Sequence, residues 1–177
     1  MQKLALLLFV AVLFVGCDRF SEQDFDATLI KDFEIVIDEN TGDIAFSLEE
    51  IMDALENEGI EPIQESIVRY NIRDIKYKVW EYAGPAESKW NGSLSILSQD
   101  GSSLYDHAVV DRVLLELNDD EDHQKLPFTQ EQKDRIAEEL LNGNSFRIKA
   151  EGSISETPVS FILQVVADVT ATADLKD

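Results

Sequence analysis

The sequence predicts a mainly β protein: a single antiparallel β-sandwich, Ig-like in its two packed sheets, with two short inserted helices. Seven or eight segments alternate apolar and polar residues with a period of two, and turn-forming residues separate them. Strands and helices do not succeed one another regularly, as a parallel sheet requires. The 177 residues suit one domain, and 44% of them are hydrophobic, which is enough for one core.

The individual strands are predicted from this alternation. They cover residues 27–37, 43–46, 72–82, 90–97, 108–117, 146–154 and 159–169. The last has the clearest pattern, because Val159, Phe161 and Leu163 begin a series of apolar residues on one parity. Gly84-Pro85 and Asp100-Gly101 are typical turn pairs, so hairpins are expected around them.

Two capping boxes predict the inserted helices. Ser47 and Glu50 precede apolar residues that share one helical face. Thr129 and Gln132 form the same pattern before a second helix, which Asn142-Gly143-Asn144 would end. We therefore expect one helix near the start of the domain and another before its last two strands.

The amino terminus has the pattern of a secretory signal. Lys3 supplies a positive charge, and Leu4 to Val15 form an apolar run, shorter than the roughly 20 residues that span a bilayer. A small residue, Gly16, then precedes Cys17, the single cysteine of the chain. The predicted organisation is a signal peptide over residues 1–16, a lipidated cysteine and flexible tether over residues 17–26, and a β-sandwich domain over residues 27–177.

Gly16-Cys17 resembles the end of the lipobox, the cleavage motif of bacterial lipoproteins, although Phe14 stands where that motif usually has leucine. The resemblance implies that a diacylglycerol is attached to the Cys17 sulfur, that the signal is removed before Cys17, and that the new amino group is acylated. Three acyl chains, at about 0.8 kcal/mol per buried CH₂, would hold the protein on its membrane. Asp18 resembles an inner-membrane retention signal that only some Gram-negative groups obey. The location therefore stays open between inner and outer membrane, facing the periplasm or the exterior.

Three features of the chain occur together: the lipobox, the strand NIRDIKYKVWEYAG, and a helix with a closing hairpin from Phe128 to Leu175. In this combination the chain resembles small, uncharacterised β-sandwich lipoproteins of Bacteroidota-like envelopes. The resemblance implies a fold and a location in the cell envelope. It carries no site residues.

The charge of the chain restricts its partners. There are 36 acidic and 15 basic residues, a formal net charge of −21. Removal of residues 1–16 takes Lys3 away and leaves 14 basic residues and a charge of −22. Because such a field repels phosphates, we expect no nucleic-acid partner. Cations, basic protein surfaces and neutral ligands suit it, although solubility alone also explains the charge.

Few residues are available for catalysis. Cys17 is expected to carry lipid, and the only histidines are His107 and His123. The sequence has no G-x-S-x-G elbow, H-E-x-x-H pair, P-loop or dinucleotide fingerprint. We therefore predict a protein that is not an enzyme. A hydrolase that uses a pair of carboxylates is the alternative, because 36 acids offer many such pairs.

Two acidic turns suit weak calcium binding, since Ca²⁺ takes six to eight oxygen ligands. The candidate ligands are Asp38, Asn40, Asp43, Asp119, Asp120 and Asp122. Their simpler explanation is a solvated turn, where aspartate is common for backbone reasons. No other cofactor is expected.

Trp80, Tyr82 and Trp90 are candidate ligand contacts, because aromatic faces pack against sugar rings; packing inside the sandwich is the simpler use. Taken together, these residues predict a non-catalytic, membrane-anchored envelope lipoprotein that binds or assembles with a protein or glycan partner. A calcium-stabilised adhesive module is the third hypothesis, after the hydrolase.

Overall fold

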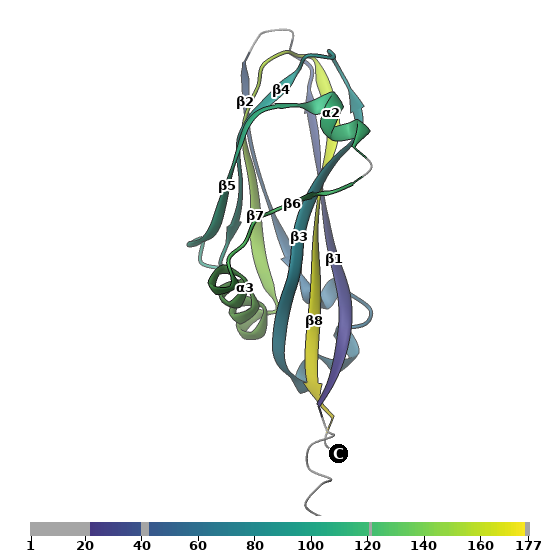
Figure 1. The fold of residues 1–177 in the computed structure, drawn as a ribbon, viewed down its shortest axis with the longest axis vertical. Coiled ribbons are helices and arrows are strands. Elements are labelled where there is room, and N and C mark those ends of the chain that lie inside the picture. The colour runs from purple at the N-terminus through teal and green to yellow at the C-terminus, as the bar shows by residue number, and fades with distance from the viewer. Residues whose placement is uncertain (1–21, 40–42, 121, 176–177) are drawn as a thin grey trace, which may run out of the picture.

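A computed structural model describes residues 22–39, 43–120 and 122–175 of the chain. The strands are β1 (Glu22–Ile37), β2 (Ile44–Asp53), β3 (Ile67–Ala83), β4 (Lys89–Leu97), β5 (Ser103–Val113), β6 (Gln124–Lys125), β7 (Ser145–Ile154) and β8 (Val159–Asp174). They form two antiparallel four-stranded sheets, with the orders β1-β8-β3-β6 and β2-β7-β4-β5, which pack face to face (Figure 1). The predicted antiparallel β-sandwich with few helices is therefore confirmed.

The strand order defines the topology more closely. The strands pair as a nested series, β1 with β8, β2 with β7, β3 with β6 and β4 with β5. This is the order of a jelly roll, in which an eight-stranded arrangement folds over as two Greek keys. The two packed sheets agree with the Ig-like expectation, but their connections differ from those of an immunoglobulin domain.

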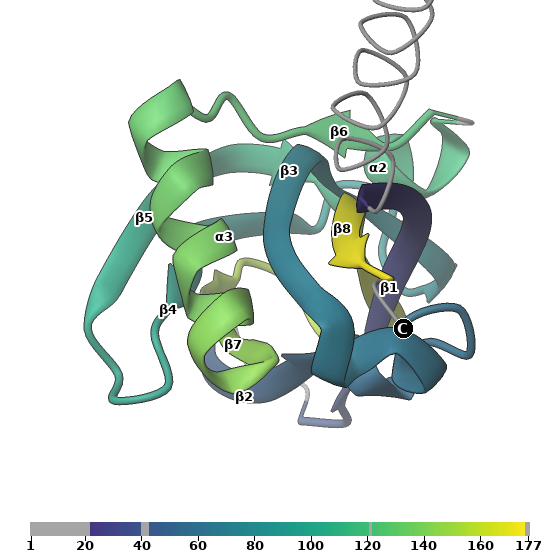
Figure 2. The same ribbon diagram turned by 90° about the horizontal axis from the view of Figure 1, so that it is seen from below.

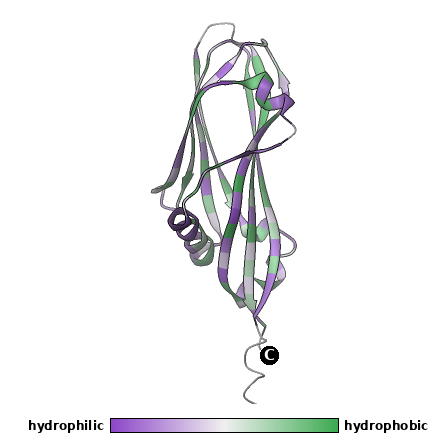
Figure 3. Ribbon diagram, in the orientation of Figure 1, coloured by the Kyte–Doolittle hydropathy of each residue, from purple (hydrophilic) through white to green (hydrophobic). Residues whose placement is uncertain are grey.

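The core lies between the two sheets, because every second residue of a strand points to the same side. On β8, all apolar residues of the predicted parity from Val159 to Val169 are buried. Leu94 and Ile96 of β4 and Ile148 of β7 are buried from the opposite sheet. Figure 3 shows the resulting alternation of hydrophilic and hydrophobic residues along the strands.

The first predicted helix was wrong. The segment after the Ser47–Glu50 capping box belongs to β2, which pairs with β7 along its whole length. Leu48 and Met52 fit a helical face, but they also share the strand parity that points into the sandwich. Pairing with β7 decided between the two patterns. Only short 3₁₀ turns follow, η2 (Ala54–Glu56) and η3 (Glu61–Ser66).

The second predicted helix is confirmed as α3 (Gln130–Gly143). The Thr129 hydroxyl accepts a hydrogen bond from the Gln132 backbone N–H at 3.3 Å, and the Gln132 side chain accepts one from the Thr129 N–H at 2.9 Å. Asn144, in the left-handed conformation, ends the helix. α3 packs on β3, β7 and β5 beside the gap between the sheets (Figure 2).

A further helix lies where a strand was expected. The predicted strand over residues 108–117 stops at Val113, and Leu114–Asp119 forms α2. Leu114 and Leu117, three residues apart, are both buried on one side of this helix. The uninterrupted apolar run at 113–115 is compatible with a buried helix as well as with a buried strand. Its periodicity therefore could not distinguish the two structures.

Both ends of the domain lie at the same end of an elongated sandwich, because Glu22 of β1 pairs with Asp174 of β8 (Figure 1). Residues 22–26, expected in the flexible tether, are therefore paired strand residues, and the domain begins earlier than residue 27. Cys17 and the predicted signal peptide over residues 1–16 lie outside the described residues. No helix within the described ranges is long and apolar enough to cross a bilayer.

Candidate functional site

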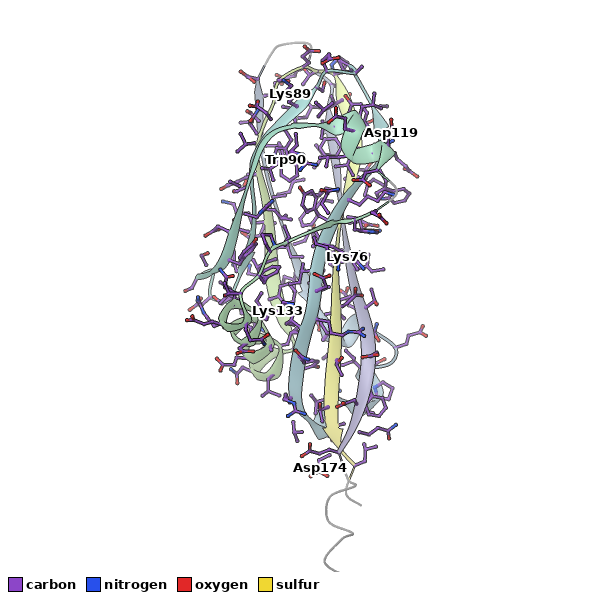
Figure 4. The ribbon with its side chains drawn as sticks, viewed as in Figure 1. Lys76, Lys89, Trp90, Asp119, Lys133 and Asp174 are labelled. Carbon is purple, nitrogen blue, oxygen red and sulfur yellow. The ribbon has the colours of Figure 1, made fainter. Side chains whose placement is uncertain are left out.

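Trp90 is a core residue, so its prediction as a candidate ligand contact was wrong. Its side chain is fully buried, with ring centroids 5.9 Å from Phe46 and 6.4 Å from Tyr77. The indole N–H donates to the backbone oxygen of Glu151 at 3.2 Å. Figure 4 places Trp90 within the upper half of the sandwich. A ligand outside the protein cannot reach it.

Trp80 and Tyr82 lie elsewhere. Trp80 of β3 pairs with Ile162 and shares the outward parity of Lys76 and Lys78, with its ring half-buried. Tyr82 is half-buried, and its hydroxyl donates to the Pro85 backbone oxygen at 2.6 Å, which stabilises the turn after β3. The structure therefore does not assemble the three aromatic residues into one platform. Trp80 alone stays a candidate contact.

The two acidic turns lie at the end of the sandwich opposite Glu22, and Figure 4 shows Asp119 there. Asp38 and Asp43 are exposed on either side of the β1–β2 connection, and Asn40 lies outside the described residues. Asp119 ends α2, and the Asp120 side chain accepts hydrogen bonds from the Asp122 backbone N–H at 3.0 Å and the Gln124 amide at 2.5 Å.

Among the residues that the structure describes, no group of three or more His, Cys, Asp or Glu side chains is arranged to hold a metal ion. Calcium binding at these turns stays a prediction.

Both histidines make contacts with neighbouring side chains of the fold. His107 of β5 stacks on Tyr105 with an interplanar angle of 9°, and its ring centroid lies 6.2 Å from Tyr77. Burial lowers the pKa of His107, and the positive charge of Arg112 lowers it further. These rings continue an aromatic row through the interior, which consists of Phe46, Trp90, Tyr77, His107, Tyr105 and Phe128.

His123 is the second histidine. Its Nε2 lies 3.3 Å from the side-chain oxygen of Gln164 on β8. Neither imidazole is therefore arranged by the fold as an exposed base beside a hydroxyl.

One feature was not predicted from the sequence: the outward face of the β1-β8-β3-β6 sheet, which we call the charged face. Most of its charges stand in two columns separated by β8, with acids on β1 and bases on β3, while Asp74 of β3 and Asp168 and Asp174 of β8 add further acids. The acidic column consists of Glu22, Asp24, Asp26, Asp32 and Glu34. The basic column consists of Arg69, Arg73, Lys76 and Lys78.

Polar rows cross the charged face between these columns. They join Arg69–Thr172–Asp24, Arg73–Asp26–Thr170, Lys76–Asp168–Thr28 and His123–Gln164–Asp32. In the third row, Lys76 Nζ lies 2.9 Å from Asp168 Oδ2, and the Thr28 hydroxyl donates to Asp168 at 3.0 Å. Burial raises the pKa of Asp168, but these bonds and nearby positive charges outweigh it and leave the pKa below its ordinary value. Figure 4 shows Lys76 about midway along the sandwich.

Apolar side chains lie among the charges in the middle and far part of this face. Ile30 and Val36 of β1 are 53% and 55% exposed. Ile162 of β8 is half-buried and pairs with Trp80 of β3. Val166, also on β8, lies in register between Ile30 and Lys76. The charged face therefore combines an apolar centre with columns of opposite charge.

The outward face of the β2-β7-β4-β5 sheet, which we call the serine face, is different. Many of its outward positions carry small side chains, namely Ala45, Ser47, Ser93, Ser95, Ala108 and Ser153, of which Ser95 is buried. The strands of this sheet also carry two exposed apolar residues, Ile51 and Val110. Its ion pairs join neighbouring residues, Arg147 with Glu49 and Lys149 with Glu151. Acids and bases thus alternate here and do not segregate into columns.

A hollow of about 210 Å³ lies between β1 and the η2 turn. The Asn57 amide donates to the Thr28 backbone oxygen at 3.1 Å, and Lys31 Nζ lies 3.2 Å from Glu56 Oε2. These bonds attach the turn to β1, so the residues around the hollow stabilise the contact between the turn and the strand.

No family model matches this sequence, and no curated protein matches it. Among solved structures, the chain is similar to the decameric BFDV capsid protein, at 11% identity over 84% of this chain and 99% of that one, with a TM-score of 0.44. The 60-mer BFDV capsid protein is similar at 12% identity over 89% and 97% of the two chains, with a TM-score of 0.45. Turnip Yellow Mosaic Virus follows at 11% identity over 88% and 97%, with a TM-score of 0.36. At these TM-scores the likeness carries no argument about what this chain does.

Proposed function

We propose that this chain is a membrane-anchored, non-catalytic module of the cell envelope that acts by binding or assembly. The observation that carries the proposal is the position of Glu22, where β1 begins at one end of an elongated sandwich (Figure 1). Glu22 follows Cys17 by five residues, which span at most about 18 Å. A lipid on Cys17 would therefore hold this end of the sandwich near the bilayer and direct the opposite end away from it.

The surroundings of the titratable side chains support a role without catalysis. His107 is stacked on Tyr105, and His123 is bonded to Gln164. On the charged face, Asp168 is paired with Lys76 and Asp26 with Arg73. Such groups stabilise a sheet surface. A hydrolase needs instead a carboxylate kept protonated by its environment beside an ionised one.

A protein partner is favoured over a glycan. The burial of Trp90 removes one of the three aromatic candidates. The aromatic surface that could stack on a sugar ring is therefore smaller than the sequence suggested. The Tyr82 hydroxyl is bonded to Pro85, and the remaining candidate, Trp80, lies beside Ile162 and among charged residues. An apolar centre with a charged rim is the usual composition of a protein–protein interface.

The anchor is tested with the complete chain in a bacterium that processes lipoproteins. The wild type is expected to incorporate labelled palmitate and to partition into detergent, and Cys17→Ser is expected to lose both properties. A second variant, Cys17→Ser with Ser21→Cys, keeps one cysteine but moves it, and should also remain unlabelled. A wild-type protein that is soluble and unlabelled would refute the anchored module.

Catalysis is tested on purified protein with panels of ester, peptide and glycoside substrates. We expect no turnover above buffer. Turnover that disappears after substitution of a single Asp or Glu by its amide would instead establish the carboxylate-based hydrolase.

A further inference from the structure

We propose that the charged face is a homodimer interface, in which two copies of the chain pack face to face about a two-fold axis that runs along β8. This inference goes beyond the proposed function, because it names a second copy of the chain as the occupant of the face. It depends on the strand register, the charges and the position of the chain ends.

The strand register makes the charged face self-complementary. β8 is flanked by β1 on one side and β3 on the other. A rotation of 180° about an axis along β8 therefore places β1 of one copy over β3 of the second copy, at the same height along the strands. Each acidic column then faces a basic column, as an isologous interface requires.

Individual rows show the match. Asp24 and Arg69 both pair with Thr172, so they stand at one height on opposite sides of β8. In the dimer, Asp24 of each copy faces Arg69 of the other. Asp32 and Lys78 both pair with Gln164, so this row gives a second such contact.

The residues on the axis suit the same arrangement. Ile162 and Asp168 point outward from β8, so each would meet its own counterpart, and each Asp168 is paired with Lys76 of its own chain. Val166 has the same parity but is buried beneath neighbouring side chains.

Exposed Ile30 and Val36 lie on β1 at the heights of Val166 and Ser160. In the dimer, Ile162 would meet Ile162 and Val36 would face Ala83 of the other copy, whereas Ile30 would face the Lys76 side chain. Apolar contacts beside charged rows are a usual composition of protein interfaces.

Other axes do not fit. A two-fold axis across the strands would place each acidic column over the acidic column of the second copy, and like charges in contact cost several kcal/mol. The axis along β8 also keeps Glu22 of both copies at the same end of the dimer. Both Cys17 anchors would then reach one membrane. This last point rests on the proposed anchoring, whereas the charge argument does not.

The net charge of the chain opposes association. Each copy without residues 1–16 carries a formal charge of −22. At physiological ionic strength, however, repulsion is screened beyond about 8 Å. Outward acids also outnumber bases on the charged face, because Asp74, Asp168 and Asp174 add to those of the acidic column. The attraction between the copies therefore comes from the Asp24–Arg69 and Asp32–Lys78 rows. Confinement of both anchors to one membrane would add effective concentration without any new contact.

The first test exchanges charges in the Asp32–Lys78 row, with complete chains in non-ionic detergent and molar mass measured by sedimentation equilibrium. Asp32→Lys places two lysines together, and Lys78→Asp places two aspartates together. Each variant alone is expected to weaken dimerisation by about tenfold or more. An equal mixture of the two variants restores both attractive contacts and should form heterodimers with nearly wild-type affinity.

Glu49→Lys on the serine face is the matched control, and it should leave dimerisation unchanged. Circular dichroism checks that each variant is folded. A monomeric wild type, or a mixture that stays monomeric while both variants are folded, would overturn the proposal.

The second test places a single thiol on the axis. Ile162→Cys in the Cys17→Ser background should be linked into dimers by a short bismaleimide, because packed sheets lie about 10 Å apart, beyond the reach of a disulfide. Ser93→Cys, on the central β4 strand of the serine face, is the matched control and should not be linked. Equal linking of both variants, or none, would contradict the interface.

The two tests also separate this inference from the proposed anchor. Cross-linking without palmitate labelling of the wild type would retain the dimer and reject the anchor. Labelling without cross-linking would retain the anchor and reject the dimer.

Discussion

The charged face and the serine face are both outward sides of four-stranded sheets in one sandwich, yet they differ in almost every respect. The charged face carries five acids on β1 and four bases on β3, with further acids on β3 and β8. The serine face carries hydroxyl and methyl groups, the exposed Ile51, and ion pairs of Arg147 with Glu49 and of Lys149 with Glu151. An outward position alone therefore does not define the use of a surface. The way in which charged residues are distributed over neighbouring strands also determines what the surface can bind.

The interior beneath the two faces differs as well. Under the serine face, Gly92 of β4 and Gly152 of β7 stand opposite each other. A Cβ atom on Gly92 would lie 1.9 Å from the Glu151 backbone oxygen, so only glycine permits the close approach of these strands. The Trp90 indole is bonded to that same oxygen. The serine face is therefore constrained from within, whereas the charged face is organised by side chains on its surface.

The largest expected effect separates the two tryptophans. Trp90→Ala should lower the free energy of unfolding by about 3–5 kcal/mol, because it empties a fully buried ring site and leaves the Glu151 oxygen without its indole donor. Trp80→Ala, on the charged face, should cost only about 1–2 kcal/mol, since part of that ring already contacts water. Urea unfolding measures both values. A larger loss for Trp80→Ala would contradict the assignment of the two residues.

The next effect concerns the paired glycines. Gly152 has φ of +147°, and a Cβ atom there would lie 2.2 Å from the Asn91 backbone oxygen. Gly152→Ala should therefore destabilise the fold by about 2–3 kcal/mol. Gly59→Ala is the control: its Cβ would meet only the end of the Asn57 side chain, at 3.1 Å, and it should cost less than about 1 kcal/mol. Equal thermal stability of the two variants would show that the strands can separate without cost.

A smaller effect is expected at Asp168 on β8 of the charged face. Asp168→Asn removes the charge that Lys76 and Thr28 contact and should cost about 1 kcal/mol near neutral pH. Because the pKa of Asp168 is lowered in the fold, its contribution is present above the ordinary value of 3.8 and is lost as the pH falls through the lower folded value. The difference in unfolding free energy between wild type and Asp168→Asn should therefore shrink below pH 3.8. A difference that does not change between pH 7 and pH 3 would refute this role for the charge.

The smallest effect belongs to the interior between the two faces. The pKa of His107 is lowered from 6.5 by burial and by Arg112, so the fold favours the neutral ring. Its contribution to stability is complete above pH 6.5 and declines as the pH falls through the lower folded pKa. His107→Gln should flatten this part of the stability profile relative to the wild type. Thermal melts at intervals between pH 5 and pH 8 measure the slopes.

Local rules predicted the parts of the fold whose stabilising bonds are close in sequence. The Thr129–Gln132 capping box predicted α3, because both hydrogen bonds lie within one turn. The alternation from Val159 onward predicted β8, because burial on one face acts on every second residue. The same rules were wrong at Leu48 and Met52, where a distant strand decided between two patterns that the residues satisfy equally.

By itself, the sequence determined that the domain is an antiparallel β-sandwich, and it defined the Cys17 motif on which the anchoring proposal depends. Only the tertiary structure decided that residues 22–26 are strand, because their strand partners at 170–174 are 144 to 152 residues away in the sequence. It also decided that Trp90 faces the core while Trp80 faces outward. The columns of the charged face could not be foreseen at all. Parity tells which residues share a face of one strand, whereas the order and register of β1, β8 and β3 arise from long-range pairing that no local pattern records.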